Sequence, residues 1–364
     1  MKKGRKFFLE IYLESEERAT YALRNLYRRY GYKPYKMSKF EEYDFYVQNK
    51  NFLLSDDVIT FTDTNGKLLA LKPDVTLSIV KNTQEGEGVK KVYYNENVFR
   101  VSGESKSFRE IMQTGLECIG DVDEYCVGEV LTLAEKSLAV LSDEYVLDVS
   151  HVGILAAAVD ETGVSAKGKE KLLFLVKEKN AHEVDDVLKE EGADVKKGEK
   201  LKKLIRTEGT PEEIVPVLRE MFFGSETAEV VEKFARTLSL VPGNKIRVDF
   251  SVLNDMRYYN GIVFQGFVVG LPSGVLSGGQ YDLLMKKMGK NAGAIGFAVY
   301  PERLLKTATE KVNDADAFVL YDESVSPSEV ADVVSGLIKE GKTVLAGKKI
   351  PSGRFGKVVS LKKE

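Results

Sequence analysis

Hydrophobic positions near the start of the chain predict one helix followed by a hairpin. From Ser15 to Tyr30 the apolar residues recur at helical spacing, and Gly31 can end that helix in a left-handed conformation. Residues 58–75 instead alternate apolar and polar positions around Asn65-Gly66, a pair typical of a two-residue turn between antiparallel strands. We therefore expect a helix, and then the first strands of a sheet.

Two longer strands are predicted next. Residues 92–101 and 109–120 are rich in β-branched, aromatic and other apolar side chains, and the polar loop SGESKS joins them. After Pro242-Gly243, the stretch from Ile246 to Gly270 predicts two more strands. SGGQYDLLMKKMG and GAIGFAVYPERLLKTA then predict a glycine-rich turn, a strand and a helix. The fold class is therefore α+β, with an antiparallel sheet flanked by helices.

Residues 159–240 interrupt this sheet with a helical insertion dominated by Lys and Glu. One helix in it begins at Thr210-Pro211, where a cap residue, a first-turn proline and Glu213 match a capping box. After Val312 a strand, a helix and a strand predict one β-α-β unit. We expect a core of residues 1–158 and 241–311, the insertion 159–240, and a C-terminal unit of residues 312–364.

Composition and charge narrow the class of protein. The chain has 364 residues, of which 43% are hydrophobic and 30% charged, and no apolar run approaches the roughly 20 residues of a membrane span. The basic start is followed by glutamates rather than by the apolar stretch of a signal peptide, so we expect a cytoplasmic protein. A net charge of -3 weighs against a dedicated nucleic-acid binder.

Cysteine and histidine are too few to suggest a metal site. The two cysteines, Cys118 and Cys126, lie far along the chain from the two histidines, His151 and His182, so zinc ligation is not expected. A disulfide between the cysteines is sterically conceivable but rare in the cytosol, and we expect ordinary thiols.

Two strand segments carry polar residues that core packing does not require. In LKPDVT, Asp74 and Thr76 are spaced to share one face of a strand, where a carboxylate and a hydroxyl suit an ammonium group; the alternative is that either residue caps the helix that follows. Gln113 and Glu117 point the same way along the strand 109–120. They could hold a cationic or amide-bearing ligand, or they could lie on a solvated outer face.

The arginines and tyrosines offer further candidates. Arg100 and Arg109 flank the SGESKS loop and could grip an anionic group, although such arginines are often only solvated. Tyr258 and Tyr259 stand at the start of a predicted strand, where neighbouring side chains point to opposite faces, so both are not expected in one core. Gly293 and Gly296, in GAIGFAVYPERLL, permit close approach of the backbone.

Taken together, these segments resemble a class II aminoacyl-tRNA synthetase core, and its histidine branch in particular. LALKPDVT resembles the segment between the first two class motifs, and NVFRVSGESKSFREIMQTGLECIG resembles motif 2. NDMRYYNGIVFQ is similar to the histidine-specific peptide of that branch. SGGQYDLLMKKMG and IGFAVYPERLL are similar to its glycine turn and motif 3. The resemblance covers residues 5–150 and 243–310.

The resemblance implies a pocket for free histidine on an antiparallel sheet. One tyrosine of the 258–259 pair would read the imidazole while the other packs, and Arg100 and Arg303 would correspond to arginines that grip ATP phosphates. The positions implied to bind histidine are Asp74, Thr76, Arg100, Gln113, Glu117, Asn254, Tyr258 and Tyr259.

Departures from the synthetase pattern favour a regulatory relative. Asn254 stands where a synthetase has the arginine used in activation, Arg257 replaces an aspartate, and Gln280 replaces another arginine. Arg100 is followed by Val101 and Ser102 rather than by the glutamate that helps to hold adenine. The tail is also about half the length of an anticodon-binding domain.

These departures make the chain similar to the regulatory subunit of ATP phosphoribosyltransferase. That family implies a non-catalytic sensor of L-histidine, without a cofactor or tRNA and away from membranes, that controls a short catalytic subunit in the first step of histidine biosynthesis. A homodimer through residues 19–50, within a hetero-oligomer, is also implied. The alternatives are a divergent histidyl-tRNA synthetase, or a histidine-binding paralogue that regulates another partner.

Overall fold

The structure is a computed structural model that describes residues 15–50, 58–83, 86, 88–101, 107–253, 258–303 and 313–361. The chain divides into two compact units, residues 1–307 and 308–364. Within the described ranges, no helix has the length and apolar character needed to cross a membrane.

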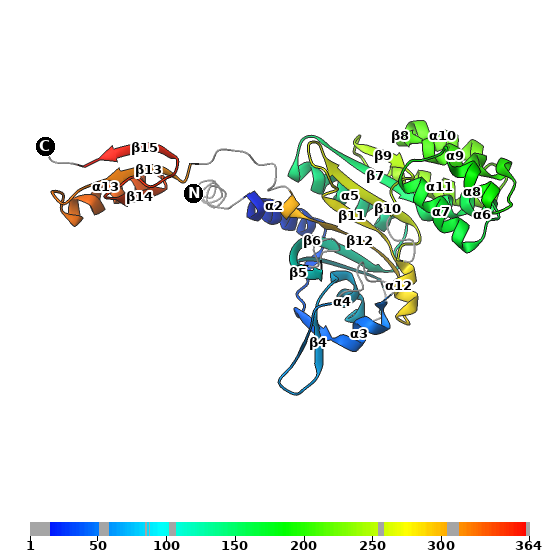
Figure 1. The fold of residues 1–364 in the computed structure, drawn as a ribbon, viewed down its shortest axis with the longest axis horizontal. Helices are drawn as coiled ribbons and strands as arrows, with labels where there is room; N and C mark the ends of the chain where they lie inside the picture. The colour runs from blue at the N-terminus through cyan, green and yellow to red at the C-terminus, as the bar shows by residue number, and fades with distance from the viewer. Residues whose placement is uncertain are drawn as a thin grey trace. The chain divides into compact units, whose positions relative to one another are not determined.

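A mixed sheet organises the first unit (Figure 1). The six central strands, β5, β6, β12, β11, β10 and β7, each pair antiparallel with their neighbours among these six. Strand β1 pairs with β5 in parallel, and β9 pairs with β7 in parallel. Among the described residues it has nine strands, in the order β1 (Lys33–Pro34), β5 (Val89–Val101), β6 (Phe108–Gly120), β12 (Gly293–Val299), β11 (Leu276–Gln280), β10 (Ile262–Val268), β7 (Tyr145–His151), β9 (Ile246–Asp249) and β8 (Glu208–Gly209). The predicted α+β class and largely antiparallel sheet are confirmed.

Two helices, α2 (Ser15–Arg29) and α5 (Glu124–Leu141), cover one face of this sheet. The helix predicted from the hydrophobic spacing is confirmed, and Leu23 and Tyr27 of α2 are fully buried. Alternation along β6 sends Leu116 and Cys118 into the same cluster. Both cysteines are buried and free, as expected.

The opposite face carries a small sheet and two short helices. Strands β2 (Phe40–Glu42), β4 (Leu68–Leu71) and β3 (Thr60–Thr62) pair antiparallel, and Gly66 has a φ of 82° in the turn of the predicted hairpin. Helices α3 (Tyr43–Gln48) and α4 (Val75–Lys81) flank it. Their apolar residues pack with Tyr94 and Ile119 of the large sheet in a second buried cluster.

The Lys- and Glu-rich segment is helical as predicted, with one added strand, β8. The helix α6 (Val152–Glu161) leads into it, and its own helices are α7 (Ala166–Lys177), α8 (Val184–Glu190), η2 (Val195–Gly198), α9 (Glu199–Arg206), α10 (Pro211–Met221) and α11 (Thr227–Ser239). Thr210 and Glu213 form the capping box of α10. Figure 1 shows the helices in green beside the edge of the sheet formed by β9 and β8.

Packing joins this helical segment to the sheet. Leu172, Leu201 and Leu218 belong to the same buried cluster as Val248 and Phe264 of the strands. The segment therefore shares the core of the first unit rather than enclosing one of its own. The domain boundaries drawn from the sequence stay a prediction.

Two expectations for the later segments need correction. The SGGQ stretch is not a turn but strand β11, and the chain turns after it into α12 (Asp282–Lys287); η3 (Pro301–Arg303) follows β12. The second unit contains β13 (Ala315–Leu320), α13 (Pro327–Lys339) and β14 (Val344–Gly347), the predicted β-α-β unit. It adds a third strand, β15 (Phe355–Ser360), parallel to β13.

Candidate functional site

A cavity of 270 Å³ opens on the face of the large sheet that carries α4. This volume is near the small end of ligand pockets, which run from about 300 to 1,000 Å³, and it suits a small metabolite. Polar groups and tyrosines dominate its wall. The lining residues are Asp74, Thr76, Tyr94, Arg100, Gln113, Glu117, Leu253, Tyr258, Tyr259, Ser277, Tyr281, Gly296, Phe297, Ala298 and Tyr300.

Glu117, on β6, is the buried carboxyl of this pocket, with 1% of its surface exposed. The Thr76 hydroxyl donates to Oε1 at 2.8 Å and the Tyr281 hydroxyl donates to Oε2 at 2.6 Å. Gly296 lies opposite Glu117 on β12, and a Cβ atom there would overlap Oε2. Gly296, the second glycine of GAIGF, therefore leaves the space that the Glu117 side chain occupies.

Burial dominates the electrostatics of Glu117. Desolvation, together with the negative charge of Asp74, raises the pKa of Glu117 to about 8, although hydrogen bonds from Tyr281 and Thr76 act in the opposite direction. Without a ligand, the Glu117 side chain is therefore mainly protonated and neutral at neutral pH. A ligand that brings positive charge, or a base able to take the proton, would favour the carboxylate.

Asp74 and Thr76 reach the pocket from the first turn of α4, not from a strand. Asp74 is the N-cap of that helix, and its carboxylate accepts a hydrogen bond from Leu77 N at 2.8 Å. The helix-cap alternative is thus correct for Asp74, and the strand-like spacing is wrong. Both residues still line the cavity, because the turn at the start of α4 faces Glu117.

Arg100 and Gln113 complete the polar wall from the paired strands β5 and β6. The Arg100 Nε donates to the carbonyl of Pro73 at 2.9 Å, and its positive charge offsets part of the burial that raises the pKa of Asp74. Gln113 is 4% exposed, so the solvated-face alternative is wrong for it. Arg109, opposite Arg100 across the two strands, is exposed and does not line the pocket.

Tyr258 and Tyr259 both line the pocket, which corrects the expectation that they would face apart. They precede β10 rather than beginning it, so strand alternation does not apply, and their ring centroids are 4.6 Å apart. Gly279 leaves room for this arrangement, since a Cβ there would lie 2.7 Å from the Tyr259 ring. The glycines of SGGQ therefore serve packing as well as strand pairing.

Sequence reasoning missed three further tyrosines, Tyr94, Tyr281 and Tyr300, that line the same cavity. A buried aromatic residue normally indicates core, and Tyr281, which follows β11, is indeed 1% exposed. The signal available was its position directly after SGGQ, within a motif already noted. Burial raises the pKa of Tyr94, Tyr258, Tyr259 and Tyr281, so these phenols stay neutral donors.

The remaining predicted residues lie elsewhere. Arg303 does not line the cavity; it donates to the Gly274 carbonyl and its guanidinium stacks 4.2 Å from the centroid of the Tyr300 ring. Asn254 and Ser102 fall outside the described residues, as does Arg257. Across the described parts of the chain, no group of three or more His, Cys, Asp or Glu side chains is placed to hold a metal ion.

The charges of the pocket match a zwitterion. Asp74 and Glu117 can face positively charged groups, Arg100 can face a carboxylate, and the neutral phenols enclose the space between them. An α-amino acid with a basic side chain has this distribution of charge.

Comparisons with known proteins show the family of the chain. The family model described as histidyl-tRNA synthetase matches residues 4–304. A protein of Caldanaerobacter subterraneus subsp. tengcongensis named ATP phosphoribosyltransferase regulatory subunit is 30% identical over 336 residues, which cover 88% of this chain and 87% of that protein.

Solved structures share the fold. One, an ATP phosphoribosyltransferase regulatory subunit/histidyl-tRNA synthetase from Bacillus halodurans, has a TM-score of 0.73 at 20% identity and covers 96% of this chain and 94% of its own. Another, histidyl-tRNA synthetase from Nostoc sp. PCC 7120, has a TM-score of 0.71 at 17% identity, with coverage of 93% and 83%.

Proposed function

The chain belongs to the histidyl-tRNA synthetase family and, within it, to the ATP phosphoribosyltransferase regulatory subunits, and from this premise we propose that it senses L-histidine. Histidine binds in the pocket around Glu117. The bound state then inhibits a short-form ATP phosphoribosyltransferase catalytic subunit in the first step of histidine biosynthesis. The chain itself performs no catalysis and acts as a homodimer within the complex.

The observation that supports this proposal is that, among the described residues, the hydrogen-bond donors to Glu117 are two neutral hydroxyls, those of Thr76 and Tyr281, in a pocket that also holds Asp74 and Arg100. Asp74 and Thr76 face the α-ammonium group, and Arg100 faces the α-carboxylate. The imidazole then lies toward Glu117 and the tyrosines. Charge-assisted hydrogen bonds of this kind are about twice as strong as neutral ones.

Histidine suits Glu117 better than lysine or arginine does. A carboxyl whose pKa is about 8 and an imidazole whose free pKa is about 6.5 can share one proton near neutral pH. A permanently cationic side chain would require Glu117 to lose its proton first. The site therefore favours a basic side chain that can also be neutral.

The sequence supports regulation rather than amino-acid activation. Asn254 cannot supply the positive charge that an arginine would place against the reacting carboxylate and phosphate, and Ser102 replaces a carboxylate that helps to hold adenine. We therefore expect neither histidyl-adenylate nor charged tRNA. Pyrophosphate exchange driven by histidine would instead identify the chain as a divergent synthetase.

Calorimetry on Glu117→Ala tests the pocket. Losing a hydrogen bond between a charged group and a buried ligand costs about 2–3 kcal/mol, so histidine affinity should fall about 30-fold to 150-fold. Glu110→Ala is the control, because Glu110 lies exposed on the same strand. Equal affinity of wild type and Glu117→Ala would place the binding site elsewhere.

A reconstituted assay tests the regulation. The chain is mixed with a short-form catalytic subunit, and phosphoribosyl transfer is measured with and without histidine. Histidine should inhibit the complex and leave the catalytic subunit alone largely unaffected. We also expect the chain without histidine to raise the activity of the catalytic subunit through their interface. By linkage, inhibition should weaken in Glu117→Ala as binding weakens, while this activation, which needs only the interface, survives. A complex that forms but ignores histidine would favour a paralogue with another partner.

A further inference from the structure

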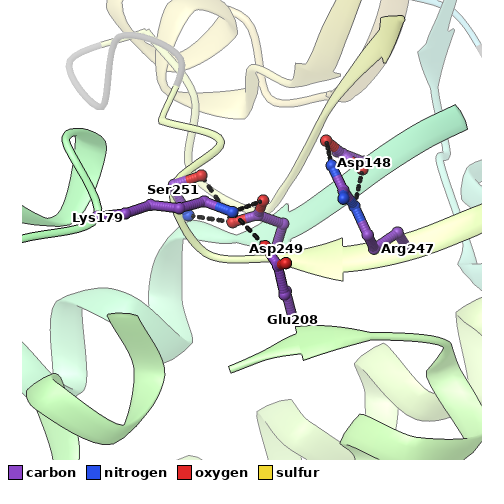
Figure 2. A network of polar contacts seen from close by, with 6 residues as sticks. All are labelled: Asp148, Lys179, Glu208, Arg247, Asp249 and Ser251. Carbon is purple, nitrogen blue, oxygen red and sulfur yellow. Dashed lines mark hydrogen bonds and ion pairs between the residues drawn. The ribbon is translucent and has the colours of Figure 1, made fainter. Parts of the chain in front are cut away.

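A polar network joins the helical segment 159–240 to the edge of the large sheet (Figure 2). Strand β8 belongs to that segment and pairs with β9, which places Glu208 directly opposite Asp249. Two carboxylates that face each other across a strand pair repel. The Lys179 ammonium resolves this, since it forms an ion pair with Glu208 and another with Asp249, the latter at 2.8 Å.

Lys179 occupies a backbone position that normally favours glycine. It follows α7 with a φ of 53°, the one positive φ of a non-glycine residue among those described. Lys179 N donates to the Val176 carbonyl and Asn180 N donates to the Leu175 carbonyl, the pattern of a Schellman helix end. A side chain in this strained conformation points to a requirement for the lysine itself.

Asp249 connects the network to the ligand pocket. Its Oδ1 accepts hydrogen bonds from Ser251 N at 2.9 Å and Ser251 Oγ at 2.6 Å, while Val252 N donates to its carbonyl at 3.2 Å. These bonds fix the turn that leads from β9 to Leu253, which lines the pocket. Asp249 is 3% exposed, so the carboxylate end of the ion pair is shielded from solvent, whereas the Lys179 side chain is 42% exposed.

The other side of the tyrosine pair is also tied to the helical segment, through residues that immediately precede that segment. Val152 N, at the start of α6, donates to the Gly261 carbonyl at 2.9 Å. The adjacent His151 caps α6 and packs edge-on against Phe234 of α11, with ring centroids 5.7 Å apart. Elements that contact the helices thus hold the chain on both sides of Tyr258 and Tyr259.

We infer that Lys179 is a positioning residue of the pocket. Through its ion pairs, the helical segment and the wall of the pocket formed by Leu253, Tyr258 and Tyr259 stabilise each other. The inference rests on the proposed function and deepens it, because it names the element to which histidine binding is coupled. By reciprocity, histidine should order the α7 end and β8, and an intact network should favour histidine binding.

The test uses Lys179→Gly in the full chain. Glycine adopts the positive φ freely, so this change deletes the ammonium without harming the helix end. Lys179→Arg keeps a cation within reach and serves as the rescue. Lys171→Met is the matched control, since Lys171 lies on α7 but pairs at 2.7 Å with Glu190, within the helical segment.

Two measurements are made on each variant: histidine affinity by calorimetry, and hydrogen exchange of peptides covering residues 246–266 without ligand. Lys179→Gly should bind histidine about fivefold more weakly, an effect at the low end of typical coupling between sites. Its peptides covering residues 246–266 should exchange hydrogen faster than those of the wild type. Lys179→Arg and Lys171→Met should stay within twofold of wild type. If Lys179→Gly does not fold, Lys179→Asn takes its place, because asparagine also tolerates this positive φ and its side chain carries no ammonium.

The outcomes separate the two proposals. Unchanged exchange and unchanged affinity in Lys179→Gly, with a wild type that binds histidine, would overturn the positioning role alone. A wild type that does not bind histidine would overturn the proposed function, and this inference with it. A loss in Lys171→Met equal to that in Lys179→Gly would show general destabilisation and would also overturn the positioning role.

Discussion

Glu117 and Asp249 are both buried carboxylates on strands of one sheet, but the chain supplies them with different partners. At Asp249 the partner is the Lys179 ammonium, helped by Ser251, and these contacts lower the pKa of Asp249 although burial alone would raise it. At Glu117 the hydrogen-bond partners are the hydroxyls of Thr76 and Tyr281, and burial raises the pKa to about 8.

The difference teaches which of the two carboxylates has a counter-charge among the residues that the structure describes. Asp249 has its counter-charge, and the structure uses the ion pair to hold two elements together. Glu117 is desolvated, and its hydrogen-bond donors among the described residues are neutral hydroxyls, so its ionised form costs free energy until another group balances it. A buried carboxylate in this state indicates a ligand site, whereas the paired one indicates a structural link.

Among the changes that test this difference between Glu117 and Asp249, Gly296→Ala should reduce histidine affinity the most. The added Cβ atom would overlap Glu117 Oε2 and the Leu116 carbonyl oxygen, so Glu117 would be expelled from its hydrogen bonds. We expect histidine affinity to fall more than about 100-fold and stability by about 1–3 kcal/mol. Calorimetry and thermal unfolding measure both.

The control for Gly296→Ala is Gly336→Ala, on α13, where an added Cβ atom meets nothing within 4 Å. This change should leave histidine affinity unaltered. Wild-type affinity in Gly296→Ala would contradict the placement of the ligand beside Glu117.

The next effect concerns pH, which should act on histidine binding through Glu117. The charged and titratable groups that line the pocket with it are Asp74, Arg100 and the tyrosines. In the bound complex, the Glu117 carboxyl and the imidazole of histidine together hold one proton. Above pH 8 free Glu117 has lost its proton, so binding must take one up and weakens as pH rises. Below about pH 6.5 both free partners are protonated, so binding must release one and weakens as pH falls.

Histidine should therefore bind best between about pH 6.5 and 8, and about tenfold more weakly at pH 9 than at pH 7.5. Calorimetry across this range measures the profile. Glu117→Gln is the control, because it keeps the titration of the ligand's own amino group and removes that of Glu117. An identical profile in Glu117→Gln would contradict the role given to this carboxyl.

A smaller effect is expected from Tyr281→Phe, which deletes one of the two neutral donors to Glu117. Losing that hydrogen bond makes the carboxylate costlier, so histidine affinity should fall about fivefold, or about 1 kcal/mol. The high-pH limit of binding should move upward, because the pKa of Glu117 rises further. Tyr125→Phe is the matched control, since the Tyr125 hydroxyl donates to Glu129 at 3.3 Å, away from the pocket.

The two regions also differ in how far the sequence predicts them. The pocket residues Asp74, Gln113 and Glu117 could be found from motifs and from alternation along one strand. The sequence predicts a strand at Thr76, because the short stretch Asp74-Val75-Thr76 has the same spacing in a strand as at the start of a helix capped by Asp74. Tyr94 is not predicted because an aromatic residue in a strand indicates core, and Tyr281 is not predicted because SGGQYDLL reads as a turn; only the folded sheet shows a cavity beside them.

The network at Lys179 could not be predicted at all from local patterns. Lys179, Glu208 and Asp249 come from a helix end and two strands that the fold brings together, and each alone reads as an ordinary charged residue. The short strand β8, which places Glu208 opposite Asp249, lies in a stretch predicted to be helical. Tertiary pairing therefore determined both the strand and the contact.

The smallest effect should come from Ser251→Ala, the counterpart of Tyr281→Phe at the other carboxylate. Both changes remove one hydroxyl donor from a buried carboxylate, but Asp249 keeps the Lys179 ammonium and the backbone N–H of residue 251. Since the counter-charge stays, stability should fall by about 1 kcal/mol or less and histidine affinity by less than about twofold. Thermal unfolding and calorimetry on both variants give the comparison. A loss of affinity in Ser251→Ala as large as that in Tyr281→Phe would mean that Asp249, like Glu117, depends on its neutral donors, and the distinction between the two carboxylates would fail.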